Sequence, residues 1–338
     1  MYKNIYKYDD RKRREHMAVR EHVGWYLWTH QLVEVQGEDA EALLELLCTK
    51  PIAALKVGKE RYTTILDEKA EIIDDVVVFR LEEQKYWVST LFAGSLIRWM
   101  SLHQGERKVS YTDITSQYHM YAVQGPDSLA MLNKLVKENV DDLKFFSFAK
   151  NQIEELPVII NRAGFTGEKM GYEIYVAADQ AQRMEELLHG VGDSMGAVEV
   201  TEFQIMAWTL PTEAGFYYMR DLRHTNPLEV GLDKGIGWDK EFIGKEALLQ
   251  IRENGAAREM LGFTVEESDI YIQGRHLGGP GQAVILDGEE VGRVYKIVYG
   301  YVKDINIGYI LAKKGALKVG DRIKIHGYDA EITERYFL

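Results

Sequence analysis

The fold is indicated most directly by residues 161–176, which read NRAGFTGEKMGYEIYV. An apolar run, Val158 to Ile160, precedes this stretch, and alternating residues end it. Three glycines lie between these two halves. The pattern therefore predicts a strand, a glycine-rich turn and a second strand.

Glu173 is the candidate binding residue of this hairpin. Successive side chains of a strand point to opposite faces, so Tyr172, Ile174 and Val176 share one face while Glu173 and Tyr175 share the other. A carboxylate accepts two hydrogen bonds at once. It would suit a ligand with two adjacent N–H donors, such as a pterin ring. A glutamate on an open strand face is also commonly a solvated surface residue, so the pattern alone leaves both interpretations open.

The composition limits the class of protein. A chain of 338 residues with 46% hydrophobic residues is long enough for two or three domains. Its 41 basic and 53 acidic residues give a net charge of −12, and this argues against a nucleic-acid partner. The nine histidines show no metal-ligand spacing, and no phosphate-binding loop or nucleophile elbow occurs. We therefore expect no metal site.

The single cysteine, Cys48, follows the leucine-rich residues 43–47 (LLELL) and is expected to be a packed thiol in a buried helix. No run of about 18 apolar residues is present, and no signal peptide opens the sequence. We expect a cytoplasmic protein without a membrane partner.

The order of predicted elements indicates an α+β protein with two similar halves. Helices are expected over residues 9–21, 39–48, 91–103, 126–136 and 180–191, and strands over residues 31–35, 61–66, 71–79, 86–89 and 120–123. From about residue 259, short apolar runs alternate with glycine turns, which is typical of a small antiparallel barrel. The expected units are residues 1–150, 151–258 and 259–338.

Seven segments in the same order resemble the glycine-cleavage T-protein (aminomethyltransferase) family of folate-binding one-carbon transferases. These segments are residues 15–20 with 24–30, 61–75, 123–126, 164–173, 212–215, 226–232 and 242–248. The resemblance implies three subdomains around a central channel in which tetrahydrofolate binds. It also implies that a one-carbon unit passes between a small substrate and the folate.

The resemblance also assigns roles to individual residues. Glu173 takes the position that holds the pterin, and Tyr62 matches a tyrosine of the channel. The family aspartate beside the pterin falls at Asp74 or Asp75. Strand alternation sends these two to opposite faces, and Asp75 is preferred for the channel. Phe165 and Asp74 complete the expected cofactor-binding set.

The sequence also departs from the family pattern. The aspartate before the family's Ser-His pair is replaced in residues 24–30, and the arginine upstream of Glu-Ala-Gly is absent from residues 206–211. The matched positions are instead rich in aromatic residues. These are often plain core, but as a set they predict an apolar slot for a flat methylated substrate, formed by Trp25, Tyr26, Trp28 and Trp208.

The chemistry expected of such a site is methyl transfer from a small donor to N5 of tetrahydrofolate. Asp75 would orient or deprotonate N5, and His30, Tyr217 or Tyr218 would protonate the leaving group. His30 has the alternative interpretation of a structural histidine at the start of a strand.

Three functions remain open from the sequence. The favoured one is a tetrahydrofolate-dependent methyltransferase or demethylase with a small, perhaps methoxy-aromatic, donor. The second is a glycine-cleavage-type aminomethyltransferase, whose partner would be a lipoyl carrier protein. The third is a folate-binding accessory protein without turnover, and the lack of cysteine in residues 240–246 counts against it.

Overall fold

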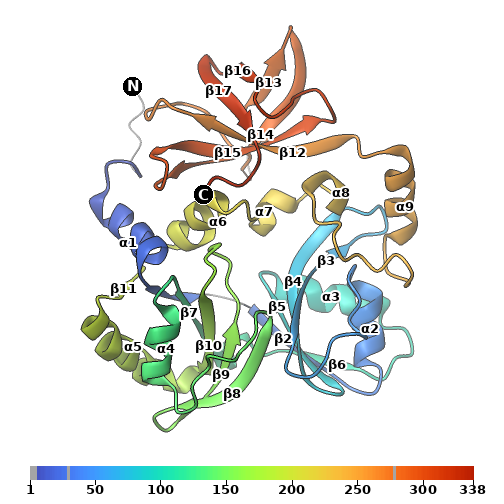
Figure 1. Ribbon diagram of the computed structural model, residues 1–338. Coiled ribbons are helices and arrows are strands. Elements are labelled where there is room, and N and C mark those ends of the chain that lie inside the picture. Colours follow the sequence, from blue (N-terminus) through green and yellow to red (C-terminus); the bar gives the residue numbers. More distant parts are fainter. Residues whose placement is uncertain (1–5, 29–30, 277–278) are drawn as a thin grey trace.

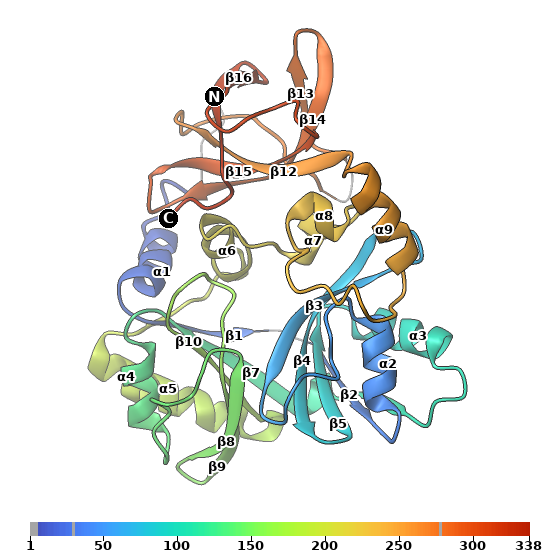
Figure 2. The same cartoon turned by 45° about the vertical axis from the view of Figure 1, so that its right-hand side comes forward.

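The computed structural model describes residues 6–28, 31–276 and 279–338. Three sheets surround a central region that contains the short helices α6 (Leu210–Glu213) and α7 (Met219–Leu222) (Figure 1). The same arrangement is visible after rotation in Figure 2. The expected α+β class with three parts around a centre is therefore confirmed. Within the described residues, no helix is long and apolar enough to cross a membrane.

The first sheet is antiparallel and has the order β3-β4-β5-β2-β6. Its strands are β3 (Glu60–Leu66), β4 (Ile72–Glu82), β5 (Lys85–Thr90), β2 (Gln31–Gln36) and β6 (Ser110–Asp113). Helices α2 (Ala40–Leu47) and α3 (Ala93–His103) pack on one face. Alternate residues such as Val76 and Val78 fill the core beneath these helices, so the intervening residues of β4 point to the opposite face.

The second sheet has the order β11-β1-β7-β10-β9-β8. Its strands are β11 (Val198–Glu199), β1 (Gly24–Trp28), β7 (Tyr118–Gln124), β10 (Gly171–Ala177), β9 (Leu156–Arg162) and β8 (Ser147–Ile153). Helices α4 (Ser128–Leu135) and α5 (Ala181–Met195) cover its outer face. The boundary expected at residue 150 does not separate the two sheets, because β1 and β7 precede it and pair with later strands.

The uncovered faces of these two sheets meet in a shared core. Phe79 of β4 contacts Tyr175 of β10 edge to face, with ring centroids 5.6 Å apart. Trp87 of β5 lies 4.7 Å from Tyr118 of β7 by the same measure. Burial of these large rings holds the two sheets together. Every second side chain of these strands therefore points from the uncovered face of its sheet toward the middle of the molecule.

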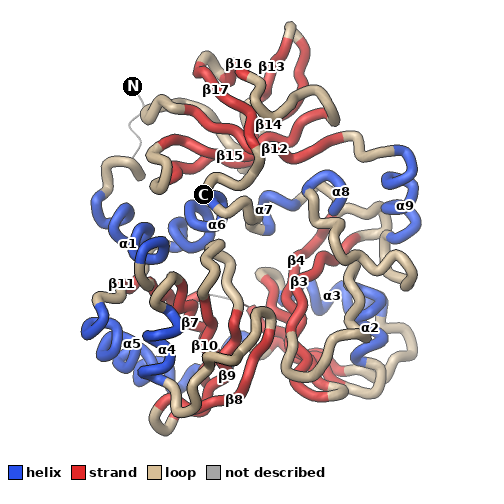
Figure 3. The backbone as a smooth tube through the Cα atoms, viewed as in Figure 1, coloured by secondary structure: helices blue, strands red, loops and turns tan. Residues whose placement is uncertain are grey.

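The third sheet is nearly closed and antiparallel, with the order β13-β14-β15-β12-β17-β16. Its strands are β13 (Ala283–Leu286), β14 (Glu289–Gly300), β15 (Ile305–Lys313), β12 (Arg258–Val265), β17 (Tyr328–Thr333) and β16 (Arg322–Ile325). The end strands β13 and β16 approach each other, and Figure 3 shows almost no helix in this upper part. The expected C-terminal barrel is confirmed. Helices α8 (Pro227–Val230) and α9 (Lys245–Asn254) connect it to the rest.

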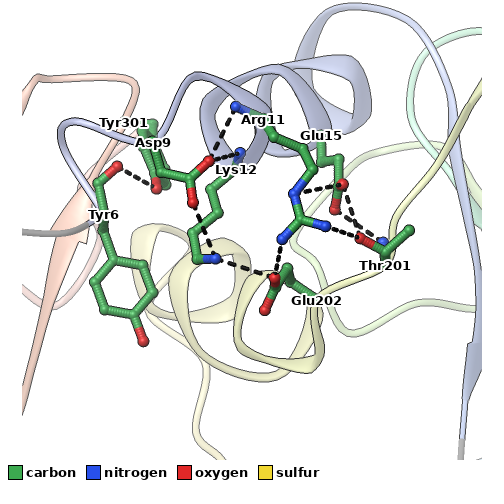
Figure 4. A network of polar contacts seen from close by, with 8 residues as sticks. All are labelled: Tyr6, Asp9, Arg11, Lys12, Glu15, Thr201, Glu202 and Tyr301. Carbon is green, nitrogen blue, oxygen red and sulfur yellow. Dashed lines mark hydrogen bonds and ion pairs between the residues drawn. The ribbon is translucent and has the colours of Figure 1, made fainter.

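Helix α1 (Asp10–Glu21) joins the second sheet to the barrel (Figure 4). Its Glu15 accepts hydrogen bonds from the backbone and hydroxyl of Thr201 at 2.8 and 2.9 Å. Lys12 lies 3.0 Å from Glu202. Just before the helix, the carbonyl of Tyr6 accepts a hydrogen bond from the hydroxyl of Tyr301 in the barrel, at 2.8 Å. These contacts fix the outer wall of the central region.

Candidate functional site

The glycine-rich turn between β9 and β10 rests on the buried side chain of Gln124. The amide nitrogen of Gln124 donates to the carbonyls of Ala163 and Tyr172, both at 3.1 Å. A Cβ atom at Gly164 or Gly171 would lie only 2.0 or 2.2 Å from Gln124 Oε1. The two glycines allow this close approach, since any larger residue would displace the Gln124 side chain from its hydrogen bonds. The turn brings Glu173 to the central face of β10.

Glu173 is 7% exposed and is held by two neighbours. The amide of Asn161 donates to Glu173 Oε2 at 2.9 Å, and the hydroxyl of Tyr175 donates to the same oxygen at 3.4 Å. The other oxygen, Oε1, accepts no hydrogen bond from any residue in the described ranges. Burial raises the pKa of Glu173 to about 7, although both hydrogen bonds lower it. One carboxylate oxygen thus remains available to a ligand.

A second buried carboxyl group, Glu60 at the start of β3, lies near Glu173. Glu60 is 4% exposed, and neither of its oxygens has a hydrogen-bond partner among the described residues. Burial and the charge of Glu173 raise the pKa of Glu60 well above its usual range. Glu60 is therefore a second buried carboxyl group whose charged form is disfavoured beside Glu173. Sequence reasoning missed it, although alternation places Glu60 and Tyr62 on the same face of β3.

Asp75 and Asp74 point to opposite faces of β4. Asp75 is half-buried on the central face and accepts a hydrogen bond from the Tyr62 hydroxyl at 3.0 Å. Asp74 is buried on the helix-covered side and accepts one from the Thr90 hydroxyl at 2.6 Å. Burial raises the pKa of Asp75 to about 6 and that of Asp74 to about 8. The cofactor contact expected of Asp74 is therefore wrong, because its side chain faces away from the centre.

Aromatic rings from β1, the hairpin and the segment after β11 gather beside this region. The Trp28 ring lies 4.4 Å from that of Phe165 and 5.5 Å from that of Phe203 by centroid, and it is nearly parallel to Phe203, with an interplanar angle of 14°. Tyr26 contacts Trp28 at 5.9 Å, and Tyr218 contacts Phe203 at 6.1 Å. These five side chains, here called the aromatic cluster, form one wall of the central region.

Trp25 does not belong to the aromatic cluster. It alternates with Tyr26 along β1 and points into the helix-covered core of the second sheet, where it is 2% exposed and contacts His189 at 4.9 Å. Its expected place in a substrate slot is wrong for this reason. Trp208 belongs to the same core group as Tyr26 and Trp28, and the Arg220 guanidinium stacks on its ring at 4.6 Å.

The proposed proton donors are in three different situations. The Tyr217 hydroxyl donates to the carbonyl of Val230 at 2.8 Å, and this contact occupies its proton. Tyr218 is half-buried, and its pKa lies above the usual value. Burial is the main cause; the positive charge of Arg220 opposes it, and the negative charge of Asp75 adds to it. His30 lies outside the described residues. Tyr218 is thus the member of the set that the structure brings near Asp75.

Comparison with known proteins identifies the family. The family model described as GCVT N-terminal domain matches residues 2–240. The chain belongs to this family. The aminomethyltransferase of Halothermothrix orenii is 32% identical over 287 residues, which are 83% of this chain and 77% of that protein. The aminomethyltransferase of Thermotoga neapolitana is 27% identical over 324 residues, which are 92% of this chain and 84% of that protein.

A solved structure shows the same fold. The crystal structure of glycine cleavage system aminomethyltransferase T from Bartonella henselae superposes with a TM-score of 0.84 at 22% identity, covering 96% of this chain and 89% of that one. Family membership makes the protein a one-carbon transferase with tetrahydrofolate as its cofactor. The residues present fit that cofactor, because Glu173 Oε1 has no donor in the part of the chain that the structure describes and the Asp75 carboxyl group faces the centre.

Proposed function

We propose that the protein transfers an aminomethyl-type one-carbon unit to tetrahydrofolate, as in the glycine-cleavage reaction. The observation that carries this proposal is the Asp75 carboxyl group, half-buried on the central face and held at 3.0 Å by Tyr62. The curated relatives named aminomethyltransferase support it further. Such a reaction needs a negative group beside the amine of the donor, and Asp75 supplies one.

Glu173 holds the pterin ring in this proposal. Its Oε2 is fixed by Asn161 and Tyr175, so its orientation is set before a ligand arrives. Oε1 is left to accept an N–H of the ring, and a carboxylate can bind two adjacent donors. Burial and the charge of Glu173 raise the pKa of the nearby Glu60, which disfavours a second negative charge beside the ligand.

In this reaction the bonds of one carbon to sulfur and nitrogen are replaced by bonds to two folate nitrogens, and two protons are transferred. Bound tetrahydrofolate would supply N5 and N10 as the acceptors of the methylene carbon from the lipoyl sulfur and the amine. The two protons lost by these nitrogens would end on the thiol and on ammonia. Asp75 takes up the proton from N5, and its pKa of about 6 leaves it ionised at neutral pH. Tyr62 keeps the carboxyl group in position.

The donor in this reaction is an aminomethyl group on a lipoyl carrier protein, which we propose as the macromolecular partner. The carrier must present its lipoyl arm to the centre between the three parts. Asp75 would attract the ammonium group of the arm over a short distance in a partly buried site, where charges are weakly screened.

Methyl transfer from a small flat donor is the second candidate function. The aromatic cluster favours it, because the partly exposed rings of Phe165 and Phe203, packed on the buried Trp28, are apolar groups of the kind that contact a planar molecule. In that reaction the methyl carbon leaves the donor oxygen and bonds to N5, and the proton of N5 passes to the released hydroxyl group. Asp75 would take the same part in it.

Product analysis separates the two functions. Purified protein is incubated with tetrahydrofolate and either an aminomethylated lipoyl carrier or a mixture of methoxy-aromatic, methylamine and sulfonium donors. Formation of 5,10-methylene-tetrahydrofolate with the carrier is the expected result. Formation of 5-methyl-tetrahydrofolate with a small donor, and none with the carrier, would replace the first function by the second.

A further inference from the structure

Arg220 is an arginine with no carboxylate partner among the residues that the structure describes. It lies on α7 in the centre of the molecule and is half-buried. Its guanidinium group stacks on Trp208 at 4.6 Å, but it makes no hydrogen bond or ion pair with any residue that the structure describes. Its Nε is sealed from solvent without an acceptor. In a chain with an excess of 12 acidic charges, an unpaired half-buried arginine is conspicuous.

The carboxylate closest in sequence does not pair with Arg220. Asp221 is 1% exposed, and its Oδ2 accepts from Lys296 Nζ at 2.5 Å and from the backbone nitrogen of Tyr218 at 3.0 Å. Its Oδ1 is buried without a hydrogen-bond partner among the described residues, so it does not contact the Arg220 guanidinium group either. The barrel also fixes the backbone here, because Arg275 Nη1 donates to the carbonyl of Arg223 at 2.7 Å. The position of Arg220 is therefore set by its neighbours, while its guanidinium group has no carboxylate partner among the described residues.

Arg220 lies in the same region as the reaction site. The charges of Arg220 and Asp75 act on the Tyr218 hydroxyl in opposite directions, and the Tyr218 ring contacts Phe203 of the aromatic cluster. The indole nitrogen of Trp208 is likewise buried without an acceptor. Arg220 and Trp208 thus place several hydrogen-bond donors next to each other, and the buried Nε of Arg220 and Nε1 of Trp208 have no acceptor among the described residues.

We propose that Arg220, oriented by its stacking on Trp208, binds a carboxylate of a ligand in the central site. A guanidinium group matches a carboxylate in shape and can donate two parallel hydrogen bonds. The proposal rests on the proposed function, because the ligand is one that Asp75 and Glu173 also contact. The carboxylate has two possible sources, the benzoyl-glutamate part of tetrahydrofolate or a carboxylate on the one-carbon donor.

The test compares Arg220→Gln with wild type by isothermal titration calorimetry, using three probes. Tetrahydrofolate carries carboxylates, 6-methyltetrahydropterin carries none, and 4-methoxybenzoate stands for an anionic flat donor and is added to protein saturated with tetrahydrofolate. Arg183→Gln is the matched control, since Arg183 is exposed and paired with Glu154 and Glu186 on the outer surface. Thermal melting checks that each variant is folded.

A loss of about 10-fold to 100-fold in tetrahydrofolate affinity for Arg220→Gln, with unchanged 6-methyltetrahydropterin affinity, assigns the carboxylate to the folate. Unchanged tetrahydrofolate affinity with a similar loss for 4-methoxybenzoate assigns it to the donor. If a folded Arg220→Gln protein binds both carboxylates as wild type does, the proposal is overturned. In the proposed function, binding of 6-methyltetrahydropterin depends on Glu173 and not on Arg220. Binding of this probe therefore tests the proposed function independently of the role of Arg220.

Discussion

Replacing Asp75 by Asn tests the chemical centre of the proposed function. The two side chains have nearly the same shape, and the amide oxygen of Asn can still accept the hydrogen bond that Tyr62 donates at 3.0 Å. What is lost is the ability to take up a proton at neutral pH. A positioned acid–base group contributes about 10²-fold to 10⁴-fold to a rate, which corresponds to about 3 to 5 kcal/mol of barrier.

The neighbouring residue provides the control. Asp74→Asn removes a carboxyl group one position away on the same strand, but Asp74 faces Thr90 on the helix side. Burial raises its pKa to about 8, so it is mostly neutral at pH 7, and a neutral Asn should replace it with little effect. We expect turnover within about threefold of wild type for Asp74→Asn, compared with a loss of at least about 100-fold for Asp75→Asn.

Single-turnover rates with tetrahydrofolate bound at saturation measure this directly. Tetrahydrofolate affinity, determined separately, should change little in either variant. The reasoning is refuted if Asp75→Asn keeps more than about a tenth of the wild-type rate, or if both variants lose activity equally, since the latter would mean that the strand rather than the carboxyl group is required.

Two further predictions concern ionisation and the hairpin. The wild-type single-turnover rate should rise with pH through about 6, because Asp75, whose pKa burial raises to that value, must be ionised to accept a proton; a rate profile flat from pH 5 to 8 would count against it. Gly167→Ala should lower the free energy of unfolding by more than about 2 kcal/mol, since Gly167 has a φ of +91° and an added Cβ would lie 2.0 Å from the Cβ of Ala214. Denaturant unfolding measures this, with Gly315→Ala, which has a φ of +76° and open space, as the control for backbone strain alone.

Features set by local alternation were predictable from the sequence. The hairpin, the opposite directions of Asp74 and Asp75, and the central direction of Glu173 all follow from the two-residue period of a strand. The glycines of residues 164–171 marked the turn because few other residues tolerate such close packing. The barrel was recognisable from its short apolar runs and glycine turns.

Features that depend on distant pairing were not predictable. Strand β1 pairs with β7 and β11, which follow it by about 90 and 170 residues, so the sequence did not show which face of β1 is covered by helices. Trp25 was consequently assigned to the wrong side. The approach of Glu60 to Glu173 and the stacking of Arg220 on Trp208 likewise join separate elements. Glu60, Trp208 and Arg220 lie outside the seven segments that resemble the family.

The central claim is that Glu173 holds the pterin of tetrahydrofolate. The most direct measurement is a calorimetric titration of tetrahydrofolate into wild type and Glu173→Gln at pH 8, where Glu173, whose pKa is about 7, is ionised. Gln keeps the size of the side chain but is neutral and presents one acceptor oxygen and an NH2 donor in place of two acceptor oxygens. We predict a loss of about 10-fold to 100-fold in affinity in a variant that melts like wild type. Equal affinity in the two proteins would contradict the account.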